Sequence, residues 1–86
     1  MTTITQLRTK IDKIDESIIK KISQRITVAK KIGLLKIKFN KKVLDKKREV
    51  ELAKMYKKLS KQYKLKSGFV QELFGLIIGY SRRVQK

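Results

Sequence analysis

The sequence predicts an all-α fold of three helices, one long and two shorter. Apolar residues recur at spacings of three and four along most of the chain, which is the period of a helix with one buried face. Proline is absent, and no segment alternates apolar and polar residues as a strand does. We therefore expect residues 1–86 to form a single all-helical domain.

The first helix is predicted to be unusually long. Its apolar series extends over roughly nine turns, or about 45–50 Å, and comprises Leu7, Ile11, Ile14, Ile18, Ile22, Ile26, Ala29, Ile32 and Leu35. A domain of 86 residues is too small to cover such a stripe, so we expect much of it to pack on a second copy. The predicted assembly is an intertwined helical homodimer. From Lys36 to Leu44 the period is lost, which predicts a loop.

Two shorter helices are predicted after this loop. The second helix begins at Asp45, a favourable N-cap, and ends near Tyr63. Residues 65–68 form the next break, with Ser67 as a candidate cap. The buried face of the third helix is predicted to consist of Val70, Leu73, Phe74, Ile77 and Ile78.

Composition restricts the possible functions. With no cysteine and no histidine, the chain cannot form a thiolate metal site or a Ser-His or Cys-His nucleophile. The 24 Lys and Arg residues against 7 Asp and Glu give a formal charge of +17, which raises the odds of nucleic-acid or anionic-membrane binding. The lysines are scattered rather than gathered on one stripe, so we favour a solvated surface that attracts small dianions. With no apolar run of about 20 residues and no signal peptide, we expect a cytoplasmic protein.

One cation interrupts the apolar stripe of the first helix. Arg25 stands in a series of seven-residue spacings whose other members, Ile4, Ile11, Ile18 and Ile32, are all isoleucine. A guanidinium on that face is desolvated unless an anion meets it, and acidic residues are scarce nearby. The sequence therefore predicts that Arg25 binds an anionic ligand inside a helical bundle.

Polar residues interrupt the other patterns in the same way. Lys36 ends the sevenfold series Ile22, Ala29, Lys36 and lies about 20° around the helix axis from Arg25. Continuing the third helix by sevens leads to Ser81 and Gln85. The second helix carries Asp45 and Glu49 at a spacing of four, with Arg48 beside them. These exceptions, from all three helices, are positioned to converge on one site.

Each exception has an ordinary alternative. Arg25 and Lys36 can extend to solvent at the bundle ends, which is the commoner outcome for a lone lysine near a helix terminus. Asp45 alone is more often a cap than a ligand contact, and Arg48 with Glu49 can be a surface charge pattern. Ser81 and Gln85 can mark the fraying end of the last helix. The convergence of all of them favours a site.

The order of these residues resembles the all-helical class of chorismate mutase over nearly the whole chain. The resemblance rests on Leu7-Arg8, Ile11-Asp12, Ile14-Asp15, Arg25, Ala29, Ile32-Gly33, Lys36, Val43, Asp45, Arg48-Glu49, Phe69-Val70, Phe74, Ile77-Ile78, Ser81 and Gln85. One departure is Lys42, where many relatives carry proline, and it bears on the stiffness of the loop. The resemblance implies an isomerase that converts chorismate to prephenate for phenylalanine and tyrosine biosynthesis. Such an enzyme needs no cofactor and no metal.

The resemblance also implies a role for each site residue. Arg25 and Arg8 would bind the two carboxylates, with Ser81 helping to hold the ring carboxylate, while Lys36 and Gln85 would flank the ether oxygen. Glu49 and the backbone around Asp45 would bind the ring hydroxyl, and Arg48 would orient this acidic edge or reach a carboxylate. Arg8 and Arg25 are about 25 Å apart along one helix, so Arg8 is expected to enter the partner's site.

Three alternatives stay open at this point. An isochorismate-pyruvate lyase shares the fold and the arginine–lysine site, although Glu49 and Ser81 favour the mutase by resemblance. A basic helical nucleic-acid-binding or scaffold protein explains the lysines but not the polar residues on apolar stripes. The chain can also be a regulatory or fused mutase domain from a larger protein.

Overall fold

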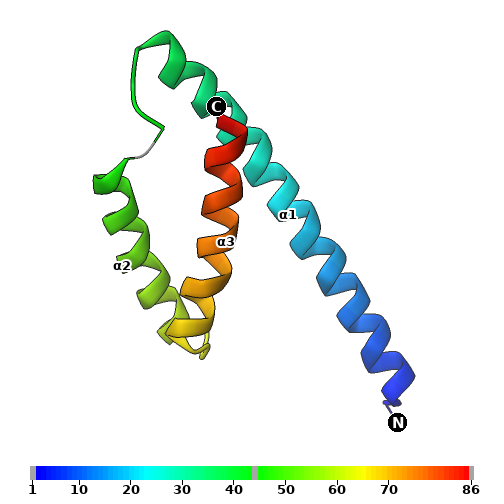
Figure 1. The fold of residues 1–86 in the computed structure, drawn as a ribbon. Coiled ribbons are helices and arrows are strands. Elements are labelled where there is room, and N and C mark those ends of the chain that lie inside the picture. Colours follow the sequence, from blue (N-terminus) through cyan, green and yellow to red (C-terminus); the bar gives the residue numbers. More distant parts are fainter. Residues whose placement is uncertain (1, 44, 86) are drawn as a thin grey trace.

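The computed structural model describes residues 2–43 and 45–85, which form three helices (Figure 1). Helix α1 spans Ile4–Lys38, α2 spans Lys46–Gln62 and α3 spans Ser67–Gln85. The last helix, α3, lies between the other two and packs against both. The predicted all-α fold of one long and two shorter helices is confirmed.

Helix α1 begins at a reciprocal cap and ends at a left-handed residue. The Thr3 hydroxyl accepts a hydrogen bond from the Gln6 amide at 3.1 Å, and the Gln6 side chain accepts one from the Thr3 amide at 2.8 Å. At the other end Asn40 has φ 54°, a conformation that asparagine tolerates better than most residues. The amide of Lys41 then donates to the carbonyl of Lys36 at 2.7 Å, which closes the last turn.

This ending corrects the predicted loop. Lys36 was expected to begin the loop, but α1 continues to Lys38 because the capping turn forms only around Asn40. Of the remaining predicted loop, residues 39–43 are non-helical as expected, and Leu44 lies outside the described residues.

The two shorter helices form an antiparallel pair with a regular register. Leu52, Tyr56 and Val70 are the buried core of this pair, and Phe74 and Ile78 pack against them. The rings of Tyr56 and Phe74 stack with their centroids 4.4 Å apart. These core residues are four apart on each helix, so they form a continuous row of contacts that runs along the length of the pair.

The predicted caps of these helices have different outcomes. Asp45 is the N-cap of α2, as expected, and its Oδ1 accepts a hydrogen bond from the Arg48 amide at 3.0 Å. Ser67 was predicted to cap α3 but is its first helical residue. The reason is that the carbonyl of Lys66 already accepts the Val70 amide at 3.2 Å, which places Lys66 at the cap position.

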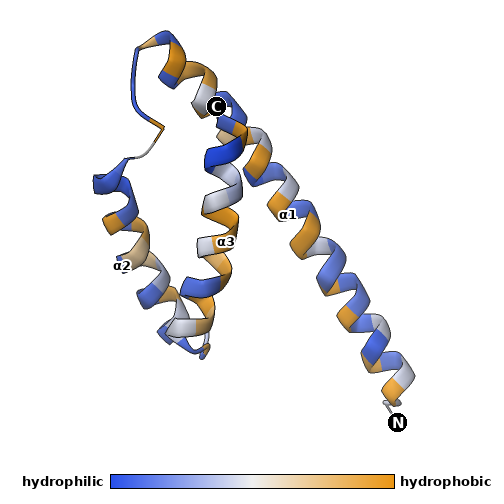
Figure 2. Ribbon diagram, viewed as in Figure 1, coloured by the Kyte–Doolittle hydropathy of each residue, from blue (hydrophilic) through white to orange (hydrophobic). Residues whose placement is uncertain are grey.

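The N-terminal half of α1 extends beyond the rest of the molecule (Figure 1). Residues 2–21 are all exposed, and the molecule measures 58 × 24 × 15 Å. Ile11, Ile14 and Ile18 remain 50–58% exposed, although they belong to the predicted apolar stripe. Figure 2 shows apolar residues recurring along this uncovered part of α1. Within the described residues, the first four members of the stripe, Leu7, Ile11, Ile14 and Ile18, are therefore largely uncovered.

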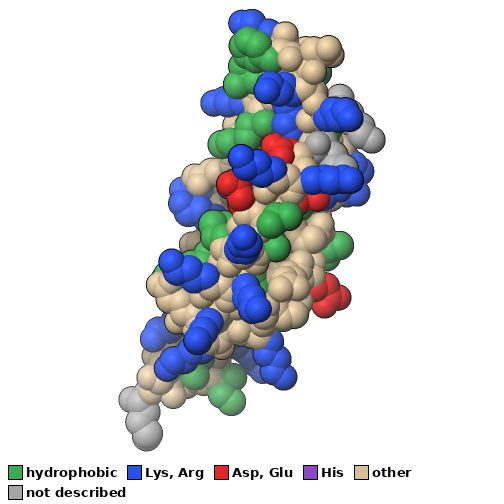
Figure 3. Space-filling model, turned by 90° about the vertical axis from the view of Figure 1, so that its left-hand side faces the viewer, with side chains coloured by type: hydrophobic (Ala, Val, Ile, Leu, Met, Phe, Trp, Pro, Cys, Tyr) green, Lys and Arg blue, Asp and Glu red, His purple; other side chains and the backbone are tan. Residues whose placement is uncertain are grey.

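Basic side chains spread over the surface without forming a single stripe. Figure 3 shows the face on the α2 side, where Lys and Arg are distributed from one end to the other and acidic side chains are few. This distribution supports the interpretation of a solvated, lysine-rich surface on that face. Within the described residues, no helix has both the length and the apolar character needed to span a membrane.

Candidate active site

A cavity of about 340 Å³ lies where the C-terminal half of α1, the start of α2 and the end of α3 come together. It brings together seven of the eight predicted site residues, namely Arg25, Lys36, Asp45, Arg48, Glu49, Ser81 and Gln85. Its apolar lining comes from Val28, Ala29, Ile32, Val43, Leu52 and Ile78. A few convergent polar groups on apolar walls are typical of a small-molecule site.

Ser81 holds Arg25 at one part of this cavity. The Nη1 of Arg25 donates to the Ser81 hydroxyl at 2.7 Å, and that hydroxyl donates to the Ile77 carbonyl at 2.8 Å. Ser81 is only 5% exposed and Arg25 is half-buried, so the contact is partly shielded from water. A guanidinium has five N–H donors, and this contact leaves most of them for a ligand. Arg25 is therefore oriented by α3 rather than extended to solvent.

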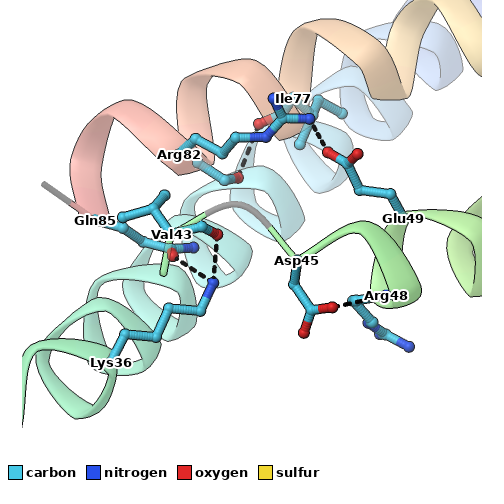
Figure 4. A network of polar contacts seen from close by, with 9 residues as sticks. Lys36, Val43, Asp45, Arg48, Glu49, Ile77, Arg82 and Gln85 are labelled. Carbon is cyan, nitrogen blue, oxygen red and sulfur yellow. Dashed lines mark hydrogen bonds and ion pairs between the residues drawn. The ribbon is translucent and has the colours of Figure 1, made fainter. Parts of the chain in front are cut away.

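Lys36 joins three segments at the other end of the site. Its Nζ donates to the Val43 carbonyl at 2.6 Å and to the Gln85 Oε1 at 3.1 Å (Figure 4). The first bond ties the loop after α1 to the helix, and the second ties α1 to the end of α3. Because an ammonium group only donates, the Gln85 oxygen faces Lys36 and its amide NH₂ is free to donate elsewhere. The contact brings together two of the predicted site residues, and their joint role at a substrate stays a prediction.

A glycine allows this close contact between α1 and α3. Gly33 is buried against the last residue of α3, and a Cβ built there would lie 2.8 Å from the Gln85 Cα and 3.0 Å from its Cβ. Any larger residue would push the helices apart. The absence of a side chain at Gly33 therefore positions Gln85 beside Lys36.

The acidic edge of the site is held by a residue that the sequence analysis did not select. Arg82 Nη2 pairs with Glu49 Oε1, joining α3 to α2 (Figure 4). Arg48 was predicted either to orient this edge or to reach a carboxylate. Its guanidinium instead lies 3.8 Å from Glu51, and both of those side chains are more than half exposed. The orientation of Glu49 thus comes from Arg82.

Arg82 also follows from the sequence once a different spacing is used. Val70, Phe74 and Ile78 face α2 at intervals of four, and the next member of that series is Arg82. Extending the apolar series at intervals of seven leads from Phe74 to Ser81 and does not include Arg82. A charged residue at the end of an apolar series of four was the available signal.

Arg8 is the one predicted site residue that the cavity does not include. It lies on the exposed N-terminal half of α1, 17 residues before Arg25, which corresponds to about 25 Å along the helix axis. Its expected place in a partner's site stays a prediction.

The charges of the cavity favour an anionic ligand. Four cations line it, Arg25, Lys36, Arg48 and Arg82, against the two carboxylates of Asp45 and Glu49, which leaves an excess of two positive charges. Both carboxylates are already engaged, one as a helix cap and the other with Arg82. Across residues 2–43 and 45–85, no group of three or more Asp, Glu, His or Cys side chains is placed to hold a metal ion. The arrangement suits a small dianion with additional hydrogen-bonding groups.

Comparison with known proteins gives a consistent result. Residues 7–86 match the family model described as chorismate mutase type II. A bifunctional chorismate mutase/prephenate dehydratase from Buchnera aphidicola is 37% identical over 79 residues, which cover 92% of this chain and 20% of that protein. A chorismate mutase from Methanocaldococcus jannaschii is 28% identical over 83 residues, covering 96% of this chain and 84% of the relative. The chain thus spans about a fifth of the first relative and most of the second.

Proposed function

This chain belongs to the chorismate mutase type II family, and we propose that it converts chorismate to prephenate. In this [3,3]-sigmatropic rearrangement an ether C–O bond breaks while a C–C bond forms, with no nucleophile and no proton transfer. The protein has to hold a flexible dianion in a compact, chair-like conformer and stabilise the negative charge that builds on the ether oxygen. The observation that carries the proposal is the convergence of two hydrogen-bonded pairs, Arg25–Ser81 and Lys36–Gln85, in one cavity.

The Arg25–Ser81 pair is proposed to bind one substrate carboxylate. Arg25 is fixed by its bond to Ser81, so its remaining N–H groups are oriented before the substrate arrives. Preorganisation of this kind reduces the entropy lost on binding and favours one conformer of the substrate.

The Lys36–Gln85 pair is proposed to stabilise the ether oxygen. The bond from Lys36 to the Gln85 oxygen directs the amide NH₂ away from the lysine, and Lys36 itself adds a positive charge. Two donors aimed at the oxygen that gains charge lower the barrier more than they stabilise the bound substrate. The Gln85 amide has no titratable group, so its donation is expected to persist through neutral pH.

Glu49 is proposed to accept a hydrogen bond from the ring hydroxyl. The backbone around Asp45 adjoins the same part of the cavity, and Arg48 adds a cation that can reach a carboxylate. An ionised carboxylate only accepts hydrogen bonds, which suits a hydroxyl partner rather than a second carboxylate.

The complete site is proposed to require a homodimer. The uncovered stripe of α1 adjoins a groove of about 390 Å³, lined by Ile14, Ile18 and Ile22 of α1 and by Leu73, Phe74 and Ile77 of α3. This exposed apolar surface supports the proposal, because a second copy packed against it would form the intertwined homodimer predicted from helix length. In that assembly Arg8 of one chain would supply the second carboxylate contact in the other. A single domain over residues 1–86 and a cytoplasmic location stay predictions.

Parallel incubation with chorismate and isochorismate tests the proposed activity. We expect prephenate from chorismate, identified by NMR, while substrate absorbance falls. Pyruvate release from isochorismate alone would instead assign the lyase activity. A folded protein that turns over neither compound but binds DNA with a steep salt dependence would support the basic scaffold alternative.

A further inference from the structure

The pair formed by Arg82 and Glu49 ends the series of contacts between α2 and α3. Along this pair of helices, Tyr56 stacks on Phe74, Ile78 packs on the same core, and Arg82 then meets Glu49 at the cavity. The core contacts fix the separation and register of the two backbones at this point. The Arg82 side chain is 42% exposed and that of Glu49 is 35% exposed, so a bound ligand would shield both further.

The Arg82–Glu49 pair uses one of the two carboxylate oxygens of Glu49. Arg82 engages Oε1, and no other hydrogen bond or ion pair to the Glu49 carboxylate occurs within the described residues. Glu49 lines the cavity, and its second carboxylate oxygen keeps the capacity to accept a hydrogen bond from a hydroxyl group. Arg48, the nearest cation in sequence, is paired with Glu51 instead.

Arg82 also keeps Glu49 from its other cationic neighbours. Arg25 and Lys36 line the same cavity, and the proposed function needs both for an incoming anion. A carboxylate without a fixed partner would compete with the substrate for these cations. Arg82 prevents this competition because it pairs with the Glu49 carboxylate and leaves Arg25 and Lys36 available to the substrate.

Resting on the proposed function, we infer that Arg82 is a positioning residue that acts on the substrate through Glu49. It holds Oε1 so that Oε2 accepts the ring hydroxyl, and it thereby contributes to recognition of hydroxyl-bearing substrates. The contact with the hydroxyl exists in both the bound substrate and the transition state. Its loss is therefore expected to raise KM and to change kcat little.

The test compares Arg82→Met with Arg83→Met in the full-length chain. Methionine keeps the length of the side chain but removes the charge. Arg83 is the matched control because it lies next in sequence and its guanidinium sits 5.5 Å from the Tyr80 ring centroid, outside the cavity lining. We expect Arg82→Met to raise KM for chorismate roughly tenfold and lower kcat less than about threefold. Arg83→Met should leave both unchanged, and Arg82→Lys should restore part of the loss.

Two further arms separate positioning from a merely structural role. In a Glu49→Gln background, Arg82→Met should add little to KM, because the group it positions is already altered. With a chorismate analogue that lacks the ring hydroxyl, Arg82→Met and the wild-type chain should have similar KM values. Circular dichroism checks that each variant is helical, and Arg82→Gln replaces the methionine variant if that variant loses helix.

The outcomes are distinguishable from failure of the proposed function. Wild-type turnover of chorismate with an unchanged KM in Arg82→Met would overturn the role of Arg82 alone. Equal losses in the Glu49→Gln background, or with the analogue, would overturn it as well. No turnover of chorismate by the folded wild-type chain would overturn the proposed function and this role together.

Discussion

The Nζ of Lys36 lies 3.1 Å from the Oε1 of Gln85, across the contact between α1 and α3. This bond determines which way the Gln85 amide faces, because the ammonium group can meet only its oxygen. The neutral NH₂ then donates at any pH, whereas a carboxyl group donates only while it is protonated.

Gln85→Glu is therefore expected to confine activity to acid. A glutamate at this position would be ionised well above its ordinary pKa of about 4. An ionised carboxylate cannot donate a hydrogen bond, and it repels the negative charge that builds on the ether oxygen. Activity should rise as pH falls through that range, while the wild-type profile stays flat through neutral pH. The measurement is kcat/KM against pH for both proteins. Parallel profiles would contradict the assignment of Gln85 to the ether oxygen.

Gly33→Ala is expected to disturb both stability and the site. A Cβ there would lie 2.8 Å from the Gln85 Cα, so α1 and α3 must separate by a few tenths of an ångström or more. We expect unfolding free energy to fall by about 1–3 kcal/mol, together with a loss of activity as Gln85 moves. Thermal unfolding and steady-state kinetics measure the two effects.

Gly75→Ala is the matched control for that substitution. It also lies inside a helix, but an added Cβ at Gly75 meets nothing within 4 Å. Because alanine favours helix over glycine, this variant should be more stable by roughly 0.5–1 kcal/mol and keep its activity. Equal effects at Gly33 and Gly75 would show that close helix contact is not what places Gln85.

Ile11→Glu is expected to prevent dimer formation. Ile11 is 54% exposed in a single chain and belongs to the uncovered stripe of α1, so a carboxylate there would be buried at the proposed interface. Sedimentation or light scattering should show a monomer with reduced helix content and little activity. Thr9→Glu adds the same charge on the opposite side of α1 and should leave the dimer intact. A monomeric wild-type chain with full activity would overturn the dimer proposal.

Mixing two inactive variants tests whether the site is shared. Arg8→Ala and Arg25→Ala remove contacts that are proposed to come from different chains of one site. Heterodimers contain one intact site, so subunit exchange should restore a part of the lost activity. If each variant alone is inactive and the mixture stays inactive after exchange, Arg8 does not act across the dimer.

The helices could be predicted because each follows a regular apolar period. The ends were less certain because they depend on single backbone turns. Helix α1 continues through Lys38 because the left-handed residue that terminates it is Asn40. Helix α3 begins at Ser67 because the carbonyl of Lys66, and not that of Ser67, accepts the first hydrogen bond of the helix. Periodicity does not report such local hydrogen bonds.

Seven of the residues that line the cavity were selected from two sequence signals. Four of them interrupt apolar series, namely Arg25, Lys36, Ser81 and Gln85, and the other three form a charged group at the start of the second helix, namely Asp45, Arg48 and Glu49. Arg82 was missed because its series runs by fours along α3, and its meaning depends on Glu49, which is 33 residues earlier in the chain. Arg8 lies outside this cavity, on the exposed N-terminal half of α1, and its proposed ligand contact is in a second copy.

Turnover of chorismate by the wild-type chain and by Arg25→Ala tests the central claim most directly. We predict that the wild-type chain forms prephenate, identified by NMR, and that Arg25→Ala loses roughly a hundredfold or more in kcat/KM while remaining helical. Lys20→Ala, on the opposite side of α1, serves as the control and should retain activity. Undiminished turnover in Arg25→Ala, or no prephenate from the folded wild-type chain, would contradict the account.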